Sequence, residues 1–146
     1  MNREIKFRGF SKELNSWVYG FLQEVDVEGV GYSYIFWQGN TTFVEANSVG
    51  QFTGFKDFDG KEIYEGDILE YVSYMRDENK RKEIVEFDEK CGGWYVHKQA
   101  DILSDILFKQ HNEEWQMKQN YTPSLKHKVR IIGNIYENPE LTQTTS

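Results

Sequence analysis

The stretch from Val49 to Ile68, VGQFTGFKDFDGKEIYEGDI, decides the fold, because short apolar runs alternate in it with turn residues. The pair Asp59-Gly60 is a favoured tight turn between two segments of strand character. Glu65-Gly66-Asp67 is a second turn and opens a strand candidate at residues 68–74. Short strands joined by polar turns in this way are typical of a small β-barrel.

Strand patterns continue on both sides of this stretch. In residues 4–10, charged and apolar side chains alternate with the period of two of a strand that has one wet face. Further strand candidates, rich in aromatic and β-branched residues, lie at residues 17–22, 32–37, 41–45, 83–87, 94–97 and 127–136. We predict a mainly β chain: a small SH3-like barrel formed by residues 49–97 and 128–137, with additional N-terminal strands in residues 4–48.

Residues 99–126 interrupt the strand pattern and are predicted to form a helical insertion. Ala100, Leu103, Ile106 and Leu107 recur at spacings of three and four, which predicts one short helix near residues 100–110. The polar part from residue 112 to 126 reads as a surface excursion. We expect a single domain over residues 1–140, followed by a flexible tail at 141–146.

Composition limits the classes of function. The chain has 146 residues, a formal net charge of -7 and a pI near 5.0, so its summed field disfavours non-specific capture of nucleic acid or anionic lipid. No apolar run is long enough to span a membrane, and the first residues do not resemble a secretory signal. A single cysteine, Cys91, excludes an intrachain disulfide. We therefore expect a cytoplasmic protein with no membrane association.

An ordered set of motifs resembles the YopX family of phage and prophage proteins. The motifs are Arg8-Gly9, Trp17-Val18-Tyr19-Gly20, residues 49–57, residues 60–68 and residues 131–140, which read IIGNIYENPE. They span nearly the whole chain. The resemblance implies a temperate phage or prophage setting and a β-rich fold of small-barrel character, and it carries over no activity and no catalytic residue.

Several polar motifs have a structural and a chemical interpretation. Asp57-Phe58-Asp59-Gly60 is a poor match to a calcium loop, since its Gly falls at the fourth position and Ile68 stands where the loop needs Glu. Glu62, Glu65 and Asp67 could bind a metal, but acids at these positions are explained by turns. We assign a structural turn role to Gly50, Gly54, Asp57, Gly60, Gly66, Asp67, Gly133 and Asn134.

No catalytic, metal or cofactor site is predicted. His97, His111 and His127 are too far apart in sequence for a local zinc signature, and Cys91 lacks a CxxC partner. Cys91 with His97 as a nucleophilic pair is weak, because Cys91 precedes Gly92-Gly93 and reads as a turn residue. Phosphate loops and the common hydrolase motifs are missing from the sequence.

The aromatic run at residues 32–37 is the main binding candidate. Tyr32, Tyr34 and Phe36 share one face of the predicted strand and Ile35 and Trp37 share the other, which favours burial on both sides, in the core or at a subunit contact. The alternative is a stacking surface for single-stranded nucleic acid beside basic residues. The candidate binding surface comprises Lys6, Arg8, Tyr34, Trp37, Arg76, Lys80, Arg81 and Lys82.

These features predict a non-enzymatic accessory or regulatory protein that acts by binding in the cytoplasm of a bacterial host. The first hypothesis is a protein-interaction module with a phage or host partner, which also self-associates into a homo-oligomer. The second is a nucleic-acid-binding barrel, and the third is an acidic mimic of DNA that blocks a host enzyme.

Overall fold

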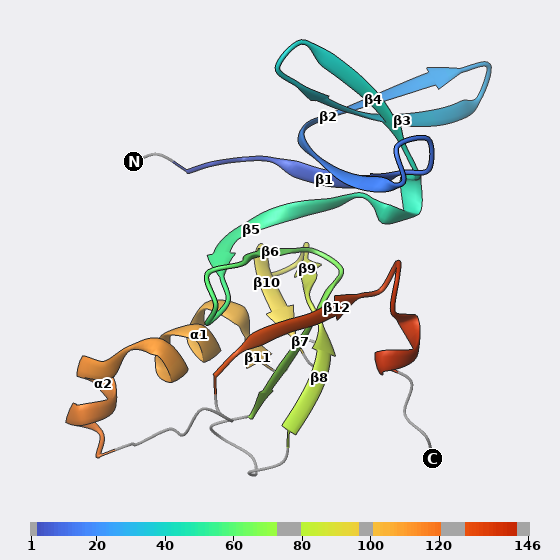
Figure 1. Cartoon of the computed structure of the whole chain (residues 1–146). Coiled ribbons are helices and arrows are strands. Elements are labelled where there is room, and N and C mark those ends of the chain that lie inside the picture. Colours follow the sequence, from blue (N-terminus) through green and yellow to red (C-terminus); the bar gives the residue numbers. More distant parts are fainter. Residues whose placement is uncertain (1–2, 73–79, 97–100, 121–127, 143–146) are drawn as a thin grey trace. The chain divides into compact units, whose positions relative to one another are not determined.

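The computed structural model describes residues 3–72, 80–96, 101–120 and 128–142 (Figure 1). The chain divides into two compact units, Met1–Gly54 and Phe55–Ser146. The strands are antiparallel and most of the regular structure is β, which confirms the mainly β prediction. Two short helices are present among the described residues where the sequence analysis expected one.

The first unit is built from consecutive hairpins. Its strands are β1 (Phe7–Ser11), β2 (Ser16–Val27), β3 (Val30–Trp37), β4 (Asn40–Val44) and the start of β5 (Gly50–Lys56), in the spatial order β4-β3-β2-β1-β5, with a 3-10 turn at Ala46–Ser48. Gly29 and Gly39, both with φ of 82°, lie in the two-residue turns after β2 and β3. Left-handed turn residues match the twist of the flanking strands and so fix the register of these hairpins.

The core of the first unit lies on one face of its sheet. Ile35 and Val44 are only 2% and 1% exposed. Val44 packs so closely on β1 that a Cβ at Gly9 would lie 2.6 Å from Val44 Cγ2. The chain after β4 also returns to β1, since the Glu45 N–H donates to the Phe10 carbonyl at 2.9 Å. The sheet is therefore strongly curled, with Val44 over Gly9.

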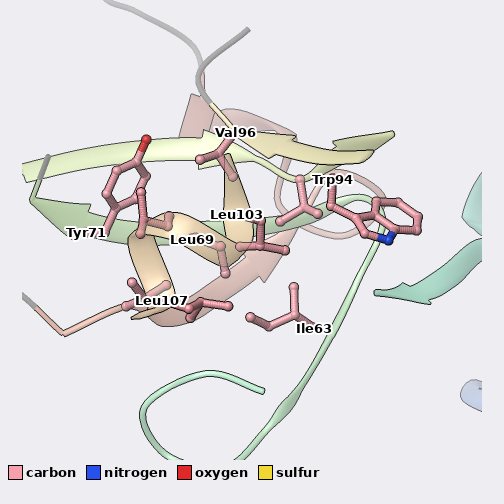
Figure 2. Close-up of a cluster of buried hydrophobic side chains, with 10 residues drawn as sticks. Ile63, Leu69, Tyr71, Trp94, Val96, Leu103 and Leu107 are labelled. Carbon is pink, nitrogen blue, oxygen red and sulfur yellow. The ribbon is translucent and has the colours of Figure 1, made fainter. Parts of the chain in front are cut away.

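The second unit combines short strands with two helices. Its elements are β6 (Glu62–Tyr64), β7 (Asp67–Val72), β8 (Lys80–Ile84), β9 (Glu86–Asp88), β10 (Gly93–Val96), β11 (Asp101–Ile102), α1 (Leu103–His111), α2 (Glu113–Lys118), β12 (Arg130–Asn134) and a C-terminal 3-10 turn at Pro139–Thr142. Its two three-stranded sheets have the orders β12-β7-β8 and β11-β10-β9. Its core contains Ile63, Leu69, Tyr71, Trp94, Val96, Leu103 and Leu107 (Figure 2).

The helix predicted near residues 100–110 is present as α1. Of the four residues that set the predicted periodicity, Leu103, Ile106 and Leu107 are the ones that it buries, and Ala100 lies outside the described residues. The second helix, α2, was missed. Its N-cap is Asn112, whose side-chain oxygen accepts the Trp115 N–H at 2.9 Å, with acidic residues in the first turn and Lys118 in the last.

The SH3-like barrel is not confirmed. The strands between residues 49 and 137 are divided among separate sheets, and those that the structure describes do not form a closed barrel. The physical reason lies in β5. Its first residues pair with β1, where Arg8 faces Gly50 and Phe7 faces Gln51, so this strand continues the N-terminal sheet. Its other neighbour in that sheet is β6, whereas β7 lies in a different sheet with β8 and β12.

The turn at residues 64–67 joins three segments of the second unit. The Asp67 carboxylate is 1% exposed and accepts the Tyr64 N–H at 2.8 Å. Gly66 and Asp67 exchange backbone hydrogen bonds with Val85, and the Gly66 carbonyl accepts the Ile135 N–H at 2.9 Å. Gly66 has φ of 89°, a left-handed conformation that favours glycine.

The contact of Val44 with Gly9 predicts a coupled pair of substitutions. Gly9→Ala should lower the free energy of unfolding by about 1–3 kcal/mol, because the added Cβ would collide with the buried, β-branched Val44, whose side chain is stiff at χ1. Val44→Ala removes the nearest methyl groups, so the double variant should be more stable than the sum of the two single effects. Guanidinium unfolding followed by tryptophan fluorescence measures all three variants, and strict additivity would contradict the contact.

The buried Asp67 predicts a larger effect than an exposed acid nearby. Asp67→Ala leaves the Tyr64 N–H without this acceptor and should cost about 1–3 kcal/mol of unfolding free energy. Asp59→Ala is the matched control. Asp59 forms an ion pair with Arg130 at 3.2 Å, but both side chains are exposed, so the loss of unfolding free energy should be only about 0.2–1 kcal/mol. Equal losses for both variants in denaturant titrations would refute this role of Asp67.

Candidate interaction surface

One face of the β2-β3-β4 sheet consists of aromatic and uncharged side chains. The register places Phe21 opposite Phe36 and Tyr34 opposite Phe43, and alternation along each strand assigns the rest. We call this set the aromatic face: Phe21, Gln23, Val25, Val27, Val30, Tyr32, Tyr34, Phe36, Thr41 and Phe43. The acids of β2, Glu24 and Asp26, fall on the opposite face by the same alternation.

The aromatic face is open to solvent in the single chain. Phe21 is 56% exposed, Phe43 46%, Phe36 42% and Tyr32 37%. Three of the rings are in contact: Phe43 meets Tyr34 edge-on at a centroid distance of 5.7 Å, and it meets Tyr32 in a tilted arrangement at 6.2 Å. A contiguous exposed apolar patch of this kind marks an interaction site, whereas apolar residues scattered singly over a surface need no such explanation.

The structure separates the two sides of β3 as the sequence predicted, but only one of them is buried. Ile35 lies in the core, and Ser33 on the same face is 7% exposed. Tyr34 is partly buried on the aromatic face. Trp37, on the side of Ile35 by alternation, is 49% exposed at the end of the strand. Tyr34 and Trp37, both in the predicted binding surface, therefore leave β3 on opposite sides, although the Trp37 ring lies 6.3 Å from the ring of Phe21.

A hollow of about 470 Å³ lies within the first unit near Trp37. Its lining comprises Glu4, Lys6, Trp17, Val18, Tyr19, Gly20, Ile35, Trp37, Asn40 and Thr42. A Cβ at Gly20 would collide with the Phe36 carbonyl and also approach Trp37, so a side chain is excluded from that position. The volume is in the range of small-molecule sites, but the polar groups of its lining do not define one ligand.

The predicted basic residues of the first unit are held by neighbours. The Lys6 ammonium pairs with Glu4 at 3.1 Å and lies 5.1 Å from the centre of the Phe52 ring. Arg8 is 8% exposed, and its guanidinium stacks over Trp17 at 4.6 Å. Both cations therefore stabilise this unit by ion-pair or cation–π contacts.

The predicted basic cluster of the second unit lies on β8. Lys80 pairs with Glu70 at 3.2 Å, and Lys82 is exposed. Arg81 is partly buried and points to the other side of the strand by alternation. Arg76 lies outside the described residues. The three described residues thus do not share one face.

The predicted turn residues make backbone contacts, some local and some to distant segments. Gly54 and Gly60 have left-handed φ of 88° and 82°, like Gly66, while Gly50 pairs with β1. Asp57 accepts the N–H groups of Asp59, Lys61 and Ile131 at 2.9–3.0 Å. Asn134 accepts those of Tyr136 and Glu137, and a Cβ at neighbouring Gly133 would collide with Asn138. The carboxylates of Asp57 and Asp67 therefore serve as hydrogen-bond acceptors for backbone N–H groups.

In the described part of the chain, no three His, Cys, Asp or Glu side chains lie together so that they could hold a metal ion. Cys91 is exposed, and its hydrogen bond to Tyr95 raises the pKa of that phenol. Burial and Lys128 lower the pKa of His111, whose Nε2 accepts the Val129 N–H at 3.2 Å. Burial and Glu86 raise the pKa of Glu65. His97 and His127 lie outside the described residues.

Sequence reasoning missed Phe21 and Phe43 as surface residues. The distribution of charged residues could have identified this surface. Residues 13–55 contain no lysine or arginine, and the acids of β2 all fall on the same side of the strand, so the other side is uncharged. In the described residues no helix has the length and apolar character needed to cross a membrane.

Comparisons with known proteins give the family and the fold. The family described as YopX protein matches residues 6–143. The crystal structure of protein EF1440 from Enterococcus faecalis is similar with a TM-score of 0.52 and 21% sequence identity, over 97% of this chain and 100% of that one, which supports the fold alone. A search of the curated proteins found no match. Because the family match covers most of its length, the chain belongs to the YopX protein family.

Proposed function

We propose that this chain is an accessory or regulatory protein of a phage or prophage that acts by binding another protein rather than by catalysis. The aromatic face is its contact surface. The phage setting and the bacterial cytoplasm rest on the family resemblance. The binding role rests on one observation: a face of the β2-β3-β4 sheet without charged side chains exposes several aromatic rings, three of which are in contact through Phe43.

Physical chemistry favours protein contact at such a face. A fully buried aromatic side chain accounts for about 150–250 Å², so each half-exposed ring still offers about 100 Å². At about 25 cal/mol per Å², covering one ring is worth about 2–3 kcal/mol before the cost of association is subtracted. The cores of protein interfaces are rich in aromatic residues and poor in charge, as this face is.

Nucleic acid binding is the less supported alternative. Stacking on aromatic rings requires cations beside them to hold the phosphates. The aromatic face has none among its side chains, and Lys6 and Arg8 are engaged by Glu4, Phe52 and Trp17. An acidic mimic of DNA draws support only from the net charge of -7.

A nuclease-treated pull-down from the induced bacterial host tests the proposal. The tagged chain should retain a stoichiometric protein after nuclease, and Phe21→Glu should abolish that retention because it places a charge at the most exposed ring of the aromatic face. Mass spectrometry identifies the retained protein, which can be a second, untagged copy of this chain.

Ile102→Glu is the matched control, since Ile102 is 48% exposed in the second unit. It should retain the protein as the wild type does. Loss of every retained species on nuclease treatment, with a steep decline of binding as salt rises, would favour the nucleic acid alternative. Equal retention by Phe21→Glu and wild type would refute the aromatic face as the contact surface.

A further inference from the structure

We infer that the partner at the aromatic face is a second copy of this chain, so that two such faces pack together about a two-fold axis. The inference rests on the proposed function, because it names the occupant of the same surface. A two-fold contact uses one patch twice, and it therefore requires a patch that is compatible with itself.

The charge distribution meets this requirement. The chain carries a net charge of -7, so two copies repel each other through most orientations. The aromatic face carries no charged side chain, and Glu24 and Asp26 lie on the other side of the sheet. Two copies that meet through this face bury no like charges against each other. A basic partner, in contrast, would find no anion on the face to pair with.

The extent of the face suits a weak dimer. Four rings that are 37–56% exposed, two half-exposed valines and the flanking side chains offer several hundred Å² on each copy. A stable interface needs about 600–800 Å² per partner. The available area is near this lower limit, so we expect a dissociation constant in the micromolar range rather than the nanomolar range.

The arrangement of the rings points to packing of sheet on sheet. Tyr34 and Phe36 lie on β3, in the middle strand of the face, and Phe43 lies on β4, the end strand of the sheet. Two such sheets pack about 10 Å apart when their side chains interdigitate. A charge at Phe43 or Phe36 would then be buried without a partner in the dimer, while it would remain in water in the monomer.

Sedimentation of the full chain over a concentration series tests the inference. The wild type should shift from monomer to dimer with a midpoint in the micromolar range, and Phe43→Glu should raise the dissociation constant by at least about tenfold. Phe108→Glu on α1 is the matched control. Phe108 is 49% exposed against 46% for Phe43, each ring packs edge-on against another ring, and the substitution is the same.

The control Phe108→Glu should dimerise as the wild type does. Added salt should leave the wild-type dimer equally stable or stabilise it, since screening reduces the repulsion between two acidic chains.

A wild type that stays monomeric at about 500 µM overturns the inference. So does a dimer that Phe43→Glu leaves intact. If the monomeric wild type still retains a different protein that Phe43→Glu loses, the second copy is refuted and the proposed function stands. If the monomeric wild type retains no other protein, both the dimer and the proposed function are refuted.

Discussion

The packing of Val44 over Gly9 is the constraint on which the N-terminal sheet depends. It requires a residue without a side chain on β1 and a buried one at the end of β4. The side-chain period of a strand is two, so burial of Val44 and Ile35 on one face sends Tyr34, Phe36 and Phe43 to the other. A slip of one residue would bury the aromatic residues and expose the core. The left-handed turns at Gly29 and Gly39 oppose such a slip.

Much of the local structure could be predicted from the sequence because it depends on near neighbours. Alternation identified the strands, the spacing of Leu103, Ile106 and Leu107 identified α1, and the turns were read from their glycines. The helix α2 was missed although Asn112 supplies a cap. It is short, and a polar segment of that length gives little periodicity to detect.

The barrel and the exposure of the aromatic face could not be predicted, since both depend on contacts between distant residues. Gly50 and Gln51 pair with β1, more than forty positions earlier in the chain, and this pairing takes β5 away from the predicted ring. Alternation correctly separated Tyr34 from Ile35. It cannot show which of two apolar faces the chain itself covers, because that follows from where Val44 and Gly9 meet.

The roles of the two units differ accordingly. Acids of the second unit bind its own backbone, as Asp57 and Asp67 do. Many of its apolar residues fill a core, while Phe108 and Ile102 are exposed. The first unit leaves Phe21, Phe36 and Phe43 at the surface. Hydroxyl-radical footprinting with residue-level mass spectrometry tests this account most directly. Oxidation of Phe21, Phe36 and Phe43 should fall as the protein concentration rises, while that of Phe108 stays constant. Uniform oxidation of all four rings at every concentration, and in the presence of any retained partner, would contradict the claim that the aromatic face is a contact surface.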